Sequence, residues 1–248
     1  NRYTETDIKQ AAKALTGYSL DRESGEVTFN PSKHDSSVQT ILGKSANFDG
    51  QSLVEFLVSR DDCATFIAER IWFRFINDST PLPDTSIQSA FSNRDIFKAI
   101  TAAINHAAIK DEANSLVRPP LEWFISACRA LQVTPSKLGN SNLAQNYLDK
   151  LSQKPFYPPN VGGWPTGEIW LTAANAQYRI ELAQILVKAG DITPISNVIA
   201  PLRVNAVLDL FGFGDVSERT RIALVAAQTD PERLITTALC APEYLVSV

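Results

Sequence analysis

Apolar residues recur every three or four positions through most of the chain, which is the period of an amphipathic helix. Near the N-terminus, Ile8 to Leu15 follow this period. Thr4 or Thr6 can cap this helix, because a threonine side chain accepts a hydrogen bond from a free amide of the first turn. Gly17 is a suitable stop.

Two further helical patterns follow in the first half of the chain. The segment 63–76, after a possible cap at Asp61 or Asp62, is apolar around most of its circumference at its C-terminal end, which predicts a place in the core. Asn93 can cap the next helix. The apolar positions of that helix form one stripe, made of Ile96, Phe97, Ile100, Ile104 and Ala107.

Prolines and glycines mark the ends of the later helices. A helix after Arg118 begins at a proline pair, where the first turn needs no amide donors. The apolar pattern from Leu171 to Leu186 predicts a long amphipathic helix that stops at Gly190. Another helix is predicted after Asp230 as its cap, with Pro231 at the first helical position.

Between residues 18 and 47 the pattern changes to short β-prone runs bounded by Gly, Pro and Asn, such as GEVTFNP and QTILGKSANFDG. We therefore expect a mainly α protein, a helical bundle-like domain with a small β-hairpin or extended arm near residues 25–45. One domain over residues 1–248 is predicted, with a possible sub-boundary at the Pro- and Gly-rich loop 155–170.

The composition excludes several classes of protein. Hydrophobic residues make up 44% and charged residues 20% of the 248 residues, which is ordinary for a globular protein. The net charge of −4 and the lack of a lysine- and arginine-rich run argue against binding to nucleic acid. No apolar run approaches the roughly 20 residues of a membrane-spanning helix. The chain begins at Asn1 and contains no methionine, so a processed or excised piece of a longer protein is expected.

Signatures of catalysis and of metal binding are weak. No nucleophile elbow, HExxH motif or phosphate-binding glycine loop occurs. Cys63, Cys128 and Cys240 are widely spaced without a CxxC pair, so buried free thiols are expected in place of a metal site or a disulfide. No cofactor and no metal is expected.

His34 is the more interesting of the two histidines, because it lies in a polar, non-helical stretch directly before Asp35. A histidine beside carboxylates can act as a base or a metal ligand. Asp35 can instead form a turn with its own backbone, and Asp49 can either supply an oxygen ligand or cap the following helix. His106 is predicted inside a helix, as a core or surface residue. His34, Asp35 and Asp49 are the catalytic candidates.

Arg70 and Arg74 lie one helical turn apart on an otherwise apolar segment. If that helix is buried, each guanidinium needs an acceptor. Glu122 is the plausible partner, so a structural ion pair is expected, with a substrate-anion site as the alternative.

The loop PFYPPNVGGWPTGEIW, residues 155–170, combines aromatic residues with a backbone stiffened by prolines. Rigid aromatics of this kind suit stacking on a sugar ring or contact with a partner peptide, and they suit equally a plug over the core. Its candidate binding residues are Tyr157, Asn160, Trp164 and Trp170.

Taken together, these segments resemble the bacterial family of domain of unknown function 1800. The resemblance runs from near Thr4 to Tyr244, and its most specific part is PPNVGGWP followed by the Trp-Leu pair at 170–171. The signature positions are Gly17, His34, Asp35, Gly43, Phe48, Pro120, Glu122, Pro159, Gly163, Trp164, Pro165 and Trp170. After the His-Asp pair, members often carry a glycine and then a lysine, where this chain has SSVQT.

The resemblance implies a cellular location for the protein but no chemical reaction. Family members are about twice this length, so this chain looks like a C-terminal half whose N-terminal half would be a partner. Members tend to be exported by bacteria and to be encoded beside exported, sulfatase-like proteins, which implies an extracytoplasmic location. The family brings no established reaction.

We therefore expect an exported binding or assembly module whose partner is a co-exported protein or a polysaccharide. The alternatives are a hydrolase with a His/Asp base or metal site, and a structural scaffold for the N-terminal half.

Overall fold

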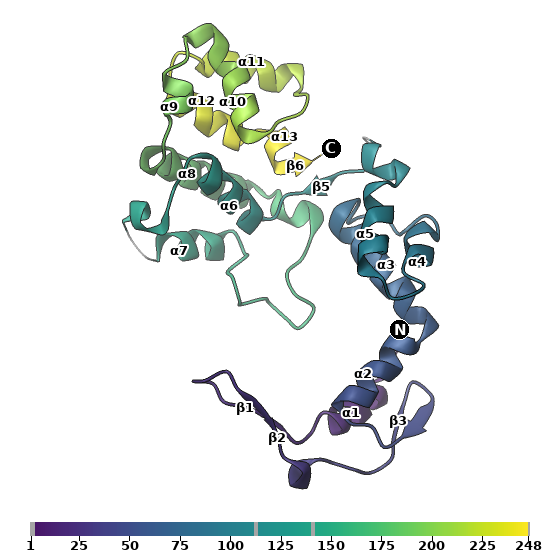
Figure 1. Cartoon of the computed structure of the whole chain (residues 1–248). Helices are drawn as coiled ribbons and strands as arrows, with labels where there is room; N and C mark the ends of the chain where they lie inside the picture. Colours follow the sequence, from purple (N-terminus) through teal and green to yellow (C-terminus); the bar gives the residue numbers. More distant parts are fainter. Residues whose placement is uncertain (1–2, 112–113, 140–141, 248) are drawn as a thin grey trace. The chain divides into compact units, whose positions relative to one another are not determined.

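The computed structural model describes residues 3–111, 114–139 and 142–247 (Figure 1). Thirteen α-helices and six short strands are present in these ranges, so the expected mainly α fold is confirmed. Contacts divide the chain into two compact units. The first unit is formed by residues 1–68 and 88–96, and the second by residues 69–87 and 97–248.

The first unit contains two helices, the N-terminal part of a third, and two β-hairpins. Its elements are α1 (Glu5–Ala14), β1 (Tyr18–Leu20), β2 (Val27–Phe29), β3 (Gln39–Ile41), β4 (Lys44–Ala46), α2 (Gly50–Ser59) and the start of α3 (Asp61–Phe75). Where the sequence predicts one hairpin or arm, β1 pairs with β2 and β3 pairs with β4, both antiparallel. Each hairpin turns at a glycine with positive φ, Gly25 or Gly43, a conformation that other residues rarely adopt.

Thr4, and not Thr6, caps α1. The Thr4 side chain accepts from the Asp7 amide, and the Asp7 carboxylate accepts in return from the Thr4 amide, which completes a capping box. The other carboxylate oxygen of Asp7 accepts from the Leu42 amide at 2.7 Å. One side chain therefore both closes α1 and fastens the β3–β4 turn to it.

The second unit holds most of the helices (Figure 1). Its elements are the rest of α3, α5 (Ile96–Ile104) after its first residue, β5 (Leu116–Val117), α6 (Pro120–Ala130), α7 (Leu143–Lys150), α8 (Ala173–Ala189), α9 (Thr193–Ser196), α10 (Arg203–Phe211), α11 (Glu218–Ala227), α12 (Pro231–Leu239), α13 (Pro242–Leu245) and β6 (Val246–Ser247). The short helix α4 (Ser86–Ala90) begins in the second unit and ends in the first. β5 pairs with β6, which joins the C-terminal strand to the chain just before α6.

The helix ends of the second unit follow the signals in the sequence. α6 begins at Pro120, α8 ends at Gly190 as its C-cap, and Asp230 caps α12 by accepting from the Arg233 amide. These ends depend on neighbours in the sequence alone, because a cap or a proline acts within one helical turn.

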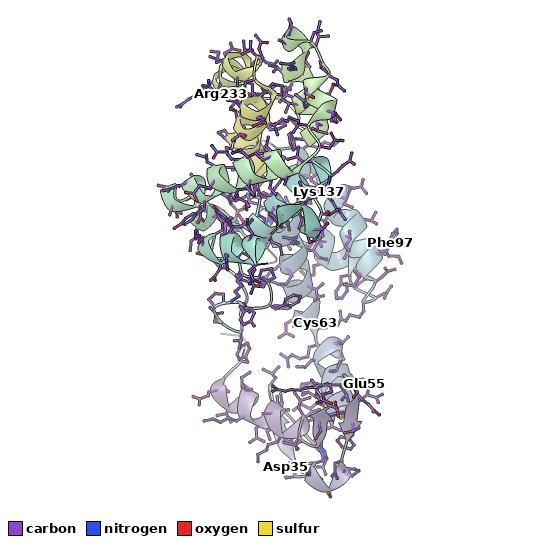
Figure 2. The ribbon with its side chains drawn as sticks, turned by 90° about the vertical axis from the view of Figure 1, so that its left-hand side faces the viewer. Asp35, Glu55, Cys63, Phe97, Lys137 and Arg233 are labelled. Atoms are coloured by element: carbon purple, nitrogen blue, oxygen red, sulfur yellow. The ribbon has the colours of Figure 1, made fainter. Side chains whose placement is uncertain are left out.

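The prediction of the α5 cap is wrong, and the structure adds which face of the helix is covered. The helix begins at Ile96, so Asn93 is not its cap. Its large apolar side chains face solvent, with Phe97 (labelled in Figure 2) 79% and Ile104 57% exposed, whereas Ala99 and Ala103 are fully buried. The helix packs through its small side chains, which permit a close approach, and its large side chains remain on the outside.

No helix in the described part of the chain has both the length and the apolar character needed to cross a membrane.

The main core is formed by side chains of α6, α8, α10 and α12. Trp123 of α6 lies in this core and is fully buried. Its indole Nε1 donates to the Leu239 carbonyl at the end of α12, at 2.8 Å. This bond joins residues 116 positions apart, so it stabilises the packing of α6 on α12.

Trp123→Phe should destabilise the protein by about 2–3 kcal/mol, because it opens a cavity and leaves a buried carbonyl without its donor. Denaturation in guanidinium, followed by circular dichroism, measures the loss. Trp164→Phe is the matched control, since Trp164 is only half-buried and should lose much less. Equal losses in the two variants would contradict the role given to Trp123.

Candidate functional site

His34 lies after β2 and after a short 3-10 turn, Pro31–Lys33. Its Nδ1 is 3.1 Å from the Thr16 carbonyl oxygen, and its ring packs against Phe29. A carbonyl can only accept, so Nδ1 carries the proton in this contact and Nε2 is the nitrogen left for other partners. The histidine thus connects the segment after β2 to Thr16, which lies two residues before β1.

The Asp35 carboxylate is bound to its own loop. It accepts from the Ser37 amide at 3.0 Å and from the Ser37 hydroxyl at 2.6 Å. These two bonds are the main cause of the lowered pKa of Asp35. The geometry is that of an Asx turn, the structural role that the sequence left open for this residue.

The Asp49 carboxylate caps α2. It accepts from the Ser52 amide at 2.8 Å and from the Ser52 hydroxyl at 2.6 Å, and these bonds lower its pKa. The Ser52 hydroxyl in turn lies 2.9 Å from the Asp49 amide and accepts from it. The residue therefore has the capping geometry expected of an aspartate before a helix.

Each of the three catalytic candidates thus has its own local structural role. His34 contributes weakly to the lowered pKa of both Asp35 and Asp49, which places it within electrostatic range of each. A carboxylate whose pKa is lowered by two local donors is a poor proton acceptor near neutral pH. Among the residues that the structure describes, no three His, Cys, Asp or Glu side chains gather in a group that could hold a metal.

Asp49→Asn should keep most of the stability of the first unit, because asparagine caps helices as well as aspartate does, whereas Asp49→Ala should lower the melting temperature by a few degrees. The folded-state pKa of Asp49 is below its ordinary value. Its contribution is therefore complete above the unfolded pKa and is lost as the pH falls through the folded pKa. Thermal unfolding between pH 2 and 7 should show a smaller acid loss in Asp49→Asn than in the wild type, because the other carboxylates with lowered pKa values still contribute in both proteins. Identical melting curves of the Ala and Asn variants would contradict the capping role.

The expected ion pair is split between two contacts. The Arg74 guanidinium contacts the Glu122 carboxylate, and both side chains are largely exposed. The Arg70 guanidinium lies over the Phe73 ring, 5.4 Å from its centroid. Arg74 and Glu122 therefore connect α3 to α6 at the surface, where such a pair contributes little to stability.

His106 lies just after α5 and not inside a helix. Its Nδ1 accepts from the Ala108 amide and its Nε2 is 3.1 Å from Asp84 Oδ2, while its ring meets Trp72 edge-on. Bonds to Ser86 and then to His106 lower the pKa of Asp84 to about 2. This histidine joins two loops.

The three cysteines are free thiols, with no disulfide in the described residues. Each is partly buried, and burial raises the pKa of Cys128 and of Cys240 to about 11. The sulfurs of Cys128 and Cys240 are therefore protonated at neutral pH, as expected of structural thiols.

The segment between α7 and α8 forms a long loop without strands (Figure 1). Its aromatic and aliphatic side chains are displayed to solvent, because Phe156 is 93% and Tyr157 67% exposed and Val161 is fully exposed. Trp164 is half-buried. Asn160 shapes the loop, since its side-chain oxygen accepts from the Gly162 amide at 2.8 Å.

The far end of this loop is anchored in the core by Trp170. This residue is 1% exposed and lies in a 3-10 turn, Gly167–Trp170. Its carbonyl accepts from Arg179 Nη1 at 2.8 Å and from Asn175 Nδ2 at 3.2 Å. The four loop residues that were expected to form one contact therefore have different roles. Tyr157 is exposed and Trp164 is half-buried. Asn160 shapes the turn, and Trp170 anchors the loop.

The sequence analysis did not identify two of the most exposed residues of the loop, or the two residues of α8 that bond the Trp170 carbonyl. Phe156 and Val161 are more exposed than the aromatic candidates Tyr157, Trp164 and Trp170. Asn175 and Arg179 hold the anchor. A signal for the last two exists, because they are four residues apart on the buried face of α8, where polar residues need a partner. No local signal distinguishes Phe156 from Tyr157.

Arg179 is a buried cation with one hydrogen bond. It is 1% exposed, and its Nε and Nη2 have no hydrogen-bond partner among the described residues. Burial lowers the pKa of Arg179 to about 10. Since one pKa unit corresponds to about 1.4 kcal/mol, keeping this group charged costs on the order of 3 kcal/mol.

Arg179→Met should leave stability unchanged or raise it by about 1–3 kcal/mol, because it removes a desolvated charge and keeps the volume. The Trp170 carbonyl retains its bond from Asn175 in this variant. Arg179→Ala should instead destabilise by about 2–4 kcal/mol, through the cavity that it leaves. Chemical denaturation of the two variants measures the difference, and a loss of the same size in both would show that the charge itself is required.

The fold and the loop together define a mainly helical protein that displays a proline-rich aromatic loop from its larger unit. A family model described as protein of unknown function (DUF1800) matches residues 1–246, and the chain belongs to this family. No curated protein and no solved structure matches the chain.

Proposed function

We propose that this protein is a binding or assembly module and that the loop 155–170 is its contact with another protein. The observation that carries the proposal is the exposure of Phe156, Tyr157 and Val161 on a loop that is anchored at its end by the buried Trp170. Large apolar side chains displayed together at a surface are typical of an interaction site.

The loop is held before any partner arrives. Prolines restrict its backbone, the Asn160 side chain closes a turn, and the Trp170 carbonyl is fixed by two donors of α8. Binding through a loop that is already ordered loses less conformational entropy, and rigid aromatics supply much contact area for few rotatable bonds. Phe156 and Tyr157 are therefore the expected energetic centre of the contact.

A protein partner suits this surface better than a polysaccharide does. The aliphatic side chains of Val161 and Ile169 are exposed beside the aromatic rings, and they fit an apolar groove of another protein. The Asn160 amide oxygen, a natural group for bonding a sugar hydroxyl, accepts from the loop backbone. A co-exported protein is the partner that we propose, together with an extracytoplasmic location, and both rest on the resemblance to family members.

The hydrolase alternative receives no support from the carboxylates of Asp35 and Asp49, since each accepts two bonds from its own loop or helix. The scaffold alternative has one observation in its favour. The outer face of α5 exposes Phe97 and Ile104, which another polypeptide could cover. This face is the alternative to the loop, so a test of the loop has to exclude it.

Photocrosslinking tests the loop directly. A photoreactive phenylalanine at Tyr157 should capture one defined protein, and the same residue at Phe97 should not. Phe156→Ala and Tyr157→Ala should each weaken binding to the captured protein by about tenfold, as expected of an aromatic residue central to an interface.

Phe97→Ala is the matched control, because Phe97 is a similarly exposed aromatic residue on α5. Loss of binding in this variant alone would transfer the contact to α5 and support the scaffold. A glycan array with the same proteins separates the partner classes, since a polysaccharide that binds wild type and not Tyr157→Ala would replace the protein partner. Equal binding by all variants would overturn the loop as the contact.

A further inference from the structure

The second unit contains a pocket of about 910 Å³ between α8, α11, α12 and the start of α13. Its volume falls in the range of pockets that take small organic molecules. Apolar side chains form much of its wall, with Ile180 and Val187 from α8, Ala223 from α11 and Pro242 at the start of α13. The loop 155–170 contributes nothing to it, so the pocket is distinct from the proposed protein contact.

Three helices each bring one cation to this pocket. Lys188 comes from α8, Arg219 from α11 and Arg233 from α12, and all three are exposed. Arg233 is labelled in Figure 2. None of the three forms an ion pair with another residue in the part of the chain that the structure describes. Their charges are therefore available to a ligand.

Most of the acidic groups at the pocket are already engaged. Asp230 accepts from the Arg233 amide at 3.1 Å as the cap of α12. Glu243 accepts from the Ser217 amide at 2.9 Å and from the Thr220 hydroxyl at 2.8 Å. Glu232 is the one lining carboxylate among the described residues without such a bond. All three carboxylates keep their negative charge, but Asp230 and Glu243 are oriented by these bonds to helix ends, and within the described ranges none of the three forms an ion pair with the lining cations.

Cys240 also lines the pocket. The protonation state of its thiol bears on whether the pocket could carry out thiol chemistry. Burial raises the pKa of its thiol to about 11, so the sulfur is neutral near pH 7. A neutral thiol is a weak nucleophile and behaves as a small apolar group. The pocket is therefore suited to binding and not to thiol chemistry.

We propose that this pocket binds a small organic anion, a carboxylate, sulfonate or phosphate ester attached to an apolar body. The apolar body lies against the walls formed by Ile180, Val187 and Ala223. The anionic group pairs with Lys188, Arg219 and Arg233 where these reach solvent. The combination of a mostly apolar wall with a few placed charges is the usual composition of a small-molecule site.

Matched probes test both halves of this proposal. Octanoate, an aryl sulfonate and phenyl phosphate are titrated into the full chain by calorimetry, and 1-octanol serves as the uncharged match of octanoate. At least one anion should bind, and octanoate should bind about tenfold more tightly than 1-octanol, the effect of one placed charge pair.

The variant Lys188→Gln/Arg219→Gln/Arg233→Gln should weaken anion binding at least tenfold and leave 1-octanol unchanged. Arg22→Gln/Lys33→Gln/Arg129→Gln is the control, since it removes the same charge from positions that do not line the pocket. Thermal melting confirms that both triple variants fold. Failure of all three anions to bind, or equal binding by the two triple variants, would overturn the proposal.

Alkylation of Cys240 provides an independent test of the same site. In a Cys63→Ala/Cys128→Ala background, the bound anion should slow the alkylation of Cys240 by maleimide, and the pocket triple variant should lose this protection. Alkylation at an unchanged rate in the presence of a saturating anion would place the ligand elsewhere and overturn the assignment.

Discussion

The burial of Trp170 at the end of the loop 155–170, with its carbonyl bonded by both Arg179 and Asn175, is the constraint on which the displayed loop depends. It fixes the point where an irregular loop becomes α8, at the cost of burying a cation that has one partner among the described residues. Because Trp170 is held in this way, the residues before it can remain extended and exposed without loosening the core. The display of Phe156 and Tyr157 thus rests on a polar contact that lies in the interior.

α8 serves both candidate surfaces of this unit. Its buried face carries Asn175 and Arg179 toward the loop anchor, and Ile180, Val187 and Lys188 line the pocket. The two surfaces differ chemically, since the loop displays uncharged apolar groups and the pocket carries three cations. The protein partner proposed for the loop and the small anion proposed for the pocket would therefore not compete for the same groups.

Local signals predicted the helix ends well, because a capping Asp230 or a stop at Gly190 acts within one turn of the chain. The face of α5 was not predictable in the same way. Its period was read correctly, yet Ala99 and Ala103 face inward and Phe97 faces solvent. Which side of an amphipathic helix is covered depends on the elements that pack against it, and no single segment encodes them.

For the candidate sites, the sequence by itself determined the loop, its prolines and aromatics, and the turn and cap chemistry open to Asp35 and Asp49. Only the tertiary structure decided that Trp170 is an anchor while Tyr157 is displayed, and that Lys188, Arg219 and Arg233 meet at one pocket. The physical reason is distance along the chain. Caps and turns join neighbours, whereas burial and convergent charge arise from residues many positions apart, brought together by the packing of α8, α11 and α12.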